Sequence, residues 1–150
     1  MDDEPIVLDT DTLSELSRRN AVVVERARSY LRTFGRLTIT SITVFERLRG
    51  YRAAIREGKP FERQLLAFEA LVANSVVLPF DDEAASVAAT IWSSATRKQR
   101  RQLGDILIAG TAIYRQLPLA TRNKQDFERL TKASGLNLRL IDWFQSPAPR

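Results

Sequence analysis

The stretch that decides the fold of this chain lies near its start and reads Ile6-Val-Leu-Asp9-Thr-Asp11-Thr-Leu13. Three consecutive aliphatic residues form a short apolar run that ends at an acid, and a segment of helical period follows at once. A short apolar run bounded by a polar residue is typical of a strand that is buried on both faces. The stretch therefore predicts a strand–helix unit whose strand ends at Asp9.

Four further short apolar runs follow along the chain, and longer segments with apolar residues at helical spacing separate them. This alternation is typical of an α/β fold with a largely parallel sheet, in which each strand is buried on both faces. The predicted strands are 6–9, 37–40, 76–79, 119–121 and 139–141, and the predicted helices are 12–20, 22–34, 41–57, 61–73, 82–95, 106–116 and 124–134.

The length of 150 residues, with 44% hydrophobic residues, fits one globular domain over residues 1–150, without internal repeats or a linker. We expect the tail, residues 146–150, to fray. No run approaches the roughly 20 apolar residues of a membrane span, and Met-Asp-Asp-Glu-Pro lacks the pattern of a secretory signal. We therefore expect a cytoplasmic protein with no membrane partner.

The composition restricts the chemistry, because the chain has no histidine and no cysteine. Their absence excludes Ser-His-Asp and Cys-His nucleophiles, His-ligated iron or zinc, iron–sulfur clusters and disulfides. Catalysis must then rest on carboxylates, hydroxyls, amides and basic side chains. The 23 Lys and Arg residues outnumber the 18 Asp and Glu residues, which favours a polyanionic partner such as nucleic acid.

Four acids lie where a parallel sheet binds ligands, beyond the carboxyl ends of its strands. Asp9 ends the first predicted strand, and Glu46 lies about one and a half turns into the helix after the second. Asp105 opens a helix, and Asp126 follows the fourth strand. Converging carboxylates repel one another unless a divalent cation neutralises them, and oxygen ligands select Mg²⁺ or Mn²⁺. Such a cation can activate water against a phosphodiester.

Each of these acids also has a purely structural interpretation. Asp9 could be a solvated strand end with Asp11 as the N-cap of the following helix, and Asp105 could be an acid that the helix dipole favours. Glu46 could complete a capping box with Thr43 or pair with Arg49, and Asn123-x-x-Asp126 is itself a capping pattern. The small residues after Asp105 could leave room for a metal and a phosphate, or they could serve close packing of the helix on the sheet.

Four blocks of sequence, one around each acid, occur in the order and at the spacings of a known family. They are Val7-Leu-Asp9-Thr-Asp11-Thr-Leu13-Ser-Glu-Leu16, Thr40-Ser-Ile-Thr-Val-Phe-Glu46-Arg-Leu48, Asp105-Ile-Leu-Ile-Ala109-Gly-Thr-Ala112 and Leu119-Ala-Thr121-Arg-Asn123-Lys-Gln-Asp126-Phe127, and the ending with Gly135-Leu136 and Asp142-Trp143 agrees. Together they resemble the PIN-domain ribonuclease toxins of the VapC type, from type II toxin–antitoxin pairs.

The resemblance implies a three-layer α/β/α fold with a central, mainly parallel five-stranded sheet, and a Mg²⁺- or Mn²⁺-dependent endoribonuclease. It assigns catalysis and metal binding to Asp9, Glu46, Asp105 and Asp126. Asp11 stands where the family often has Asn, so a direct or water-mediated metal role is open. Thr121 and Asn123 match polar residues that are expected to orient the fourth acid. These support residues complete the implied site.

The resemblance also implies partners. They are an RNA substrate, a second copy in a homodimer, and a VapB-type antitoxin whose tail enters the active-site groove. DNA is expected only through the antitoxin complex. The chain departs from the family at Gly110, where a second Ala is usual, and this departure lowers helix propensity without touching the catalytic residues.

A basic run, Arg97-Lys98-Gln99-Arg100-Arg101, precedes Asp105 directly. These four cations could hold RNA phosphates, or they could form a solvated basic loop. The family signature does not include them.

Other classes of protein remain as alternatives. Asp9-Thr-Asp11 also resembles the first motif of haloacid-dehalogenase phosphatases, with Asp9 as nucleophile, but Ala109 stands where that family needs a second late acid. A receiver domain would need an acid at the end of a middle strand, and the strand at 76–79 lacks one. A PIN-like module that binds RNA or a partner without catalysis is the third alternative, against which the intact acids argue.

Overall fold

A single parallel sheet forms the centre of the computed structural model, which describes residues 4–145. The predicted fraying of residues 146–150 falls outside the described residues. The strand order is β3-β2-β1-β4-β5, with Val7 of β1 opposite Thr38 on one side and Leu119 on the other. The strands are β1 (Val7–Leu8), β2 (Thr38–Thr40), β3 (Val76–Leu78), β4 (Leu119–Ala120) and β5 (Leu140–Ile141).

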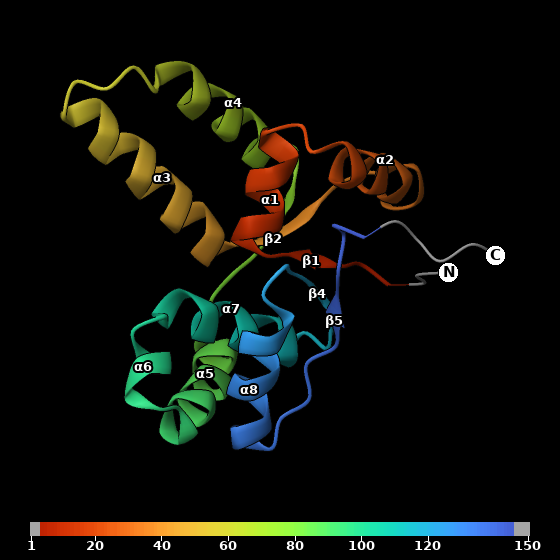
Figure 1. Ribbon diagram of the computed structural model, residues 1–150, viewed down its shortest axis with the longest axis vertical. Helices are drawn as coiled ribbons and strands as arrows, with labels where there is room; N and C mark the ends of the chain where they lie inside the picture. The colour runs from red at the N-terminus through yellow and green to blue at the C-terminus, as the bar shows by residue number, and fades with distance from the viewer. Residues whose placement is uncertain (1–3, 146–150) are drawn as a thin grey trace.

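Helices cover both faces of the sheet (Figure 1). Helices α1 to α4 lie on one face and α5 to α8 on the other, so the predicted three-layer α/β/α architecture is confirmed. Within the described part of the chain, no helix is both long enough and apolar enough to cross a membrane. The helices are α1 (Thr10–Ser17), α2 (Ala21–Phe34), α3 (Ser41–Arg56), α4 (Glu62–Ala73), α5 (Asp82–Ser94), α6 (Arg97–Arg100), α7 (Leu103–Tyr114) and α8 (Lys124–Ser134).

The central strands supply both hydrophobic cores, because successive strand side chains point to opposite faces. Ile6 and Leu8 enter the core beneath α1 and α2, whereas Val7 enters the core on the other side, with residues of α5, α7 and α8. In β4, Leu119 and Ala120 divide between the cores in the same way. The apolar run at residues 6–8 therefore contributes to the cores on both faces of the sheet, and so it links the two helical layers through the sheet.

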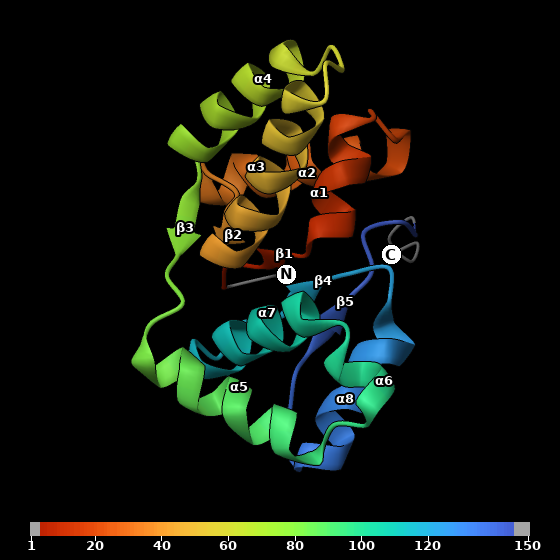
Figure 2. The same cartoon turned by 90° about the vertical axis from the view of Figure 1, so that its left-hand side faces the viewer.

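The edge of the sheet departs from the sequence prediction. Strand β3 lies at the edge (Figure 2), and Val76 and Val77 keep 43% and 36% of their surfaces exposed. The prediction that every strand is buried on both faces is therefore wrong for β3. An edge strand has a neighbour on only one side, so apolar composition alone does not ensure its burial.

Two helix boundaries and one connection also differ from prediction. Helix α1 begins at Thr10 because the Asp9 carboxylate accepts a hydrogen bond from the Thr10 amide, so Asp9 is the N-cap and Asp11 is not. Helix α7 begins at Leu103, three residues early. The basic run forms the short helix α6, which a reciprocal capping box between Thr96 and Gln99 starts.

The small residues of α7 serve close packing between two helices. Ala109 and Ala112 are fully buried. A Cβ atom on Gly110 would lie 2.8 Å from the Cβ and 2.9 Å from the backbone nitrogen of Ala88 in α5. This contact favours the interpretation that these small residues serve close packing over the interpretation that they leave room for a metal and a phosphate. The helix packs closely on α5 in addition to the sheet. The contact also leaves no room for the Ala that the resemblance leads us to expect at this position.

We expect Gly110→Ala to lower the free energy of unfolding by about 1–3 kcal/mol, because the added methyl group overlaps the backbone of α5. Gly50→Ala is the matched control, since Gly50 lies inside α3 and a Cβ there meets nothing within 4 Å. At Gly50 the gain in helix propensity should raise stability by about 0.5–1 kcal/mol. Urea unfolding measures both variants, and equal stability of the two would contradict the packing argument.

Candidate active site

The predicted acids meet beyond the carboxyl ends of the central strands of the sheet. Asp9 follows β1 directly, and the carboxyl ends of the two neighbouring strands are followed by Ser41 and Thr121. The chain connects β1 to β2 across one face of the sheet, whereas β4 and β5 are connected across the other. A doubly wound sheet has its binding crevice at this change of direction.

Asp9 is held in place from two sides. Its side chain is 3% exposed and accepts hydrogen bonds from the Thr10 amide at 2.9 Å and from the Thr121 hydroxyl at 2.8 Å. The expectation that Thr121 orients Asp126 is therefore wrong, since its hydroxyl donates to Asp9. The backbone amide of Asn123 supports this contact, because it donates a hydrogen bond to the Thr121 hydroxyl oxygen at 3.1 Å.

Glu46 is held between α1 and α7. The Thr10 hydroxyl donates to its Oε1 at 3.0 Å and is 3.0 Å from the Thr43 hydroxyl oxygen. On the other side, a Cβ atom added to Gly104 would lie only 2.5 Å from Glu46 Oε2. The carboxylate therefore occupies the space that any side chain at position 104 would need.

The structural alternatives for Glu46 are not realised in the described residues. Thr40 is the N-cap of α3, and its hydroxyl accepts from the Thr43 amide, so Thr43 and Glu46 do not form a capping box. The ion pairs between residues 4 and 145 do not include Glu46 with Arg49.

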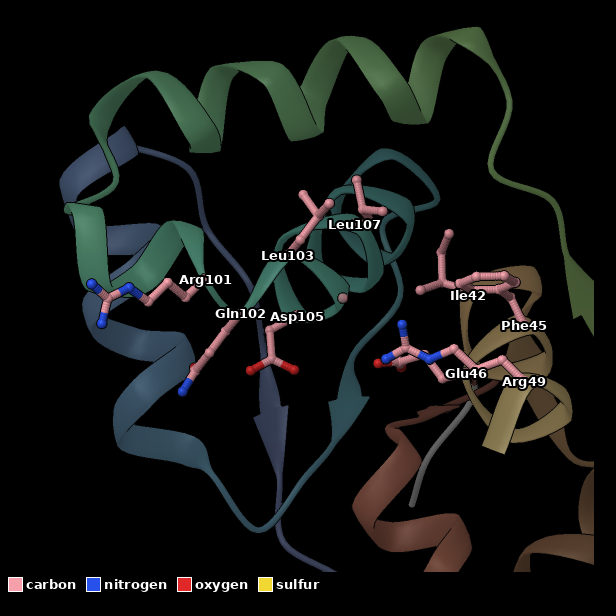
Figure 3. A pocket seen from close by; sticks show the side chains of 10 residues that line it. Ile42, Phe45, Glu46, Arg49, Arg101, Gln102, Leu103, Asp105 and Leu107 are labelled. Carbon is pink, nitrogen blue, oxygen red and sulfur yellow. The ribbon is translucent and has the colours of Figure 1, made fainter. Parts of the chain in front are cut away.

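Asp105 faces Glu46 from the first turn of α7 (Figure 3). Burial raises the pKa of Asp105 to about 6, and the charges of Glu46, Asp11 and Asp126 add to the rise. Burial likewise raises the pKa of Asp9 to about 8, with further contributions from Asp11 and Asp105. These five carboxyl groups thus share one electrostatic environment, and we call them the acid cluster.

Asp126 and Asp11 form the more open side of the acid cluster. Asp126 is exposed in the first turn of α8, and Asn123 begins that helix without a side-chain cap, so the predicted capping alternative is not formed. Asp11 accepts a hydrogen bond from the Arg122 amide at 3.1 Å, which ties α1 to the loop after β4. A hollow of about 360 Å³ lies here, lined by Arg122, Asn123, Lys124, Gln125 and Asp126.

The donor set of the acid cluster fits a hard divalent cation. It consists of oxygen atoms only, and its members destabilise one another's charged forms. Between residues 4 and 145, however, no three acids form a ready-made metal-binding group. Mg²⁺ does not require such a group, because it is usually held by one or two carboxylates and keeps several of its waters.

The metal-free protein should lose stability as the pH rises from about 4 to 8. In the unfolded chain Asp9 and Asp105 titrate near the ordinary pKa of about 3.9, whereas in the folded chain their pKa values are about 8 and 6. The native state therefore binds more protons in this window, and its free energy of unfolding falls as those protons leave. Thermal unfolding in EDTA between pH 5 and 8 measures the slope.

Asp9→Asn should flatten that slope, because it removes the most perturbed acid. Asp82→Asn, at an exposed acid in the first turn of α5, should keep the wild-type slope. A wild-type melting temperature that stays constant or rises over this range would contradict the assigned burial of Asp9.

A second hollow of about 360 Å³ lies between α3 and α7, and we call it the α3–α7 hollow (Figure 3). Glu46 and Asp105 form its acidic side, and Arg49 and Arg101 add positive charge. Its lining residues are Ile42, Phe45, Glu46, Arg49, Arg101, Gln102, Leu103, Gly104, Asp105 and Leu107.

The four predicted RNA-binding cations do not share one environment. Arg101 lines the α3–α7 hollow. The Arg100 guanidinium lies 4.9 Å from the centre of the Trp92 ring and donates to the Trp92 carbonyl oxygen, so it also fixes α6 on α5. Arg97 and Lys98 are exposed.

Sequence reasoning missed two residues that position Glu46, namely Thr10 and Gly104. Thr10 stands between two predicted site acids, and its small hydroxyl side chain was an available signal. Gly104 precedes Asp105, but its close approach to Glu46 joins residues that are 58 positions apart. Only the packing of α3 against α7 reveals that contact.

The family profile described as "PIN domain" matches residues 6–133 of the chain. The chain belongs to the PIN-domain family. A relative from Salmonella typhimurium, named "tRNA(fMet)-specific endonuclease VapC", is 32% identical over 139 residues, which are 91% of this chain and 96% of the relative. A relative of the same name from Shigella flexneri is 35% identical over 111 residues, which are 73% of this chain and 76% of the relative.

Solved structures agree with this membership. One chain of the DNA-bound VapBC complex from Salmonella typhimurium matches with a TM-score of 0.70 and 28% identity, over 93% of this chain and 98% of that one. The sequence resemblance to VapC-type PIN domains is thus confirmed by both comparisons.

Proposed function

We propose that this PIN-domain protein is a Mg²⁺- or Mn²⁺-dependent endoribonuclease and the toxin of a type II toxin–antitoxin pair. The observation that carries the proposal is the acid cluster beyond the carboxyl ends of the central strands. Burial, and then the charges of the neighbouring acids, raise the pKa values of Asp9 and Asp105, and a bound divalent cation would offset that repulsion. The names of the VapC relatives supply the class of reaction.

The side chains of the acid cluster have distinct parts in this proposal. Asp9, Glu46, Asp105 and Asp126 would hold the cation, and Asp11 would support them. A bound divalent cation supplies a nucleophilic water at neutral pH and stabilises the charge that develops on the phosphodiester. Thr121 holds Asp9 and Thr10 holds Glu46 through hydrogen bonds, so both carboxylates are oriented before substrate binds.

RNA is the proposed substrate, and a tRNA is the first to test, because two relatives are named as tRNA(fMet)-specific endonucleases. A VapB-type antitoxin is the proposed partner, since similar solved structures are VapBC complexes. We propose that the protein forms a homodimer and meets DNA only through the antitoxin; one similar solved structure is a VapBC complex bound to DNA.

Helix α6 and Arg101 are proposed to hold RNA phosphates next to the acid cluster. The support is their basic charge and the place of Arg101 in the α3–α7 hollow. Replacement of Arg97, Lys98 and Arg101 together should weaken RNA binding and reduce the dependence of log Kd on log salt concentration. An unchanged salt dependence would leave these residues as a solvated surface.

The phosphatase alternative gains no support from the site. Ala109, which stands where that class needs a second late acid, is fully buried in the core beneath α5. A binding module without catalysis is distinguished by experiment. Brief expression of the protein should arrest growth and create new RNA ends that sequencing can map. Growth arrest without new RNA ends would favour the binding module.

A further inference from the structure

Phe45 is a large apolar residue that the proposed chemistry does not use. It precedes Glu46 in α3, and 60% of its surface is exposed. Other apolar residues of α3 supply the core positions of this helix. The Phe45 ring lines the α3–α7 hollow together with Glu46 and Asp105 (Figure 3). An aromatic ring therefore stands open beside the acid cluster.

The surroundings of Phe45 combine apolar surface with positive charge. Ile42, Leu103 and Leu107 line the same hollow, and Leu103 is 47% exposed. The Arg49 guanidinium lies 5.4 Å from the centre of the Phe45 ring, and Arg101 is the second cation of the hollow. An aromatic ring flanked by cations is the combination that binds single-stranded nucleic acid, by stacking of bases and attraction of phosphates.

We propose that Phe45 stacks on an unpaired base of the RNA, at a nucleotide next to the bond that is cut. The inference rests on the proposed ribonuclease function and adds a substrate feature to it. A base stacked inside a duplex has no free face, so the nucleotide that meets Phe45 must be unpaired, as in a loop or a bulge, or be flipped out of its stack. Arg49 and Arg101 then hold the phosphates on either side of that nucleotide.

Charge favours RNA over a second copy of the chain as the occupant of the hollow. The protein carries a net charge of +5, and two arginines border the Phe45 surface. A contact that joins this surface to the same surface of a second copy would bring the arginines of both copies together, whereas RNA brings the opposite charge. A contact between copies is kept as an outcome of the test.

The test pairs a variant of Phe45 with an RNA that lacks one base. The cleavage site of wild-type protein is mapped first on a stem–loop RNA, and each nucleotide that flanks the cut is then made abasic in turn. For wild type, one of the two abasic RNAs should show a kcat/KM about 5- to 150-fold lower than intact RNA, which is the range for loss of one stacked base. Phe45→Ala should show a similar loss with intact RNA and no further loss with that abasic RNA.

Matched variants separate stacking from other effects. Phe45→Trp should keep activity, whereas Phe45→Leu, which is apolar without a ring, should lose most of it. Tyr114→Ala should act as wild type, because Tyr114 is also exposed, with the Arg115 guanidinium 5.4 Å from the centre of its ring, but lies at the far end of α7.

Several results would overturn the inference. Losses from Phe45→Ala and from the abasic RNA that multiply in combination would show that ring and base act independently. Wild-type activity of Phe45→Ala would also overturn it. So would a loss of activity in Phe45→Ala that a higher protein concentration reverses as a larger oligomer forms, because that result would indicate a contact between copies. In these cases wild-type cleavage leaves the proposed function standing. Failure of wild-type protein to cut any RNA with Mg²⁺ or Mn²⁺ would overturn both proposals.

Discussion

Replacement of Asp105 by Asn is expected to lower kcat/KM for RNA cleavage by about 100-fold or more while the fold is kept. Asp105 lies in the acid cluster and faces Glu46, and a catalytic cation is worth several kcal/mol of transition-state stabilisation. The amide has nearly the shape of the carboxylate but no charge, so it weakens the hold on a cation without opening a cavity. Cleavage of labelled RNA and growth of cells that express the variant measure the loss.

Asp82→Asn is the matched control for Asp105→Asn. Both acids lie in the first turn of a helix, so both substitutions remove a similar interaction with the helix dipole. Asp82→Asn should keep wild-type cleavage and growth arrest. Asp105→Asn should melt in EDTA no lower than wild type, because burial and its acidic neighbours disfavour the charge that it removes. Wild-type cleavage by Asp105→Asn would falsify its place in the catalytic site.

Gly104→Ala is expected to lower kcat/KM by about 10- to 100-fold without loss of stability. The new methyl group would lie 2.5 Å from Glu46 Oε2 and 3.0 Å from its Cδ, so the carboxylate must move. The hydrogen bond from Thr10 to the other carboxylate oxygen opposes a simple rotation. A displacement of about 1 Å in a catalytic group can reduce the rate by about 100-fold.

A double-mutant cycle tests this steric argument. Glu46→Asp withdraws the carboxylate from Gly104, so the loss in the Gly104→Ala, Glu46→Asp double variant should be smaller than the product of the two single losses. Gly50→Ala is the control for a helix glycine without a neighbour, and it should cleave as wild type. Activity of Gly104→Ala within twofold of wild type would show that Glu46 has more freedom than its contacts imply.

The strands and the grouping of acids at their carboxyl ends could be predicted because both depend on local pattern. An apolar run that ends at Asp9 and is followed by helical period specifies a strand, a turn of direction and a helix. Parallel strands bring their carboxyl ends to one edge, so the placement of Asp9 near the other acids required no knowledge of distant contacts. The burial of β3 could not be predicted, because its edge position depends on the strand order.

The details of the site could not be predicted, because they depend on distances between segments far apart in the sequence. Thr121 was expected to orient Asp126, which lies in the same sequence block, but strand pairing between β1 and β4 places its hydroxyl beside Asp9. Gly104 and Gly110 look alike in sequence, yet one makes room for Glu46 and the other for α5. Helix packing decides between these roles.

The central claim is that the acid cluster acts through a divalent cation, and cleavage of RNA with and without chelation tests it most directly. Purified protein should cut RNA in Mg²⁺ or Mn²⁺, lose that activity in excess EDTA and regain it when either cation is returned in excess. Asp105→Asn protein, prepared in parallel, should be inactive throughout and so exclude a contaminating nuclease. Full cleavage by wild-type protein in excess EDTA would contradict the account.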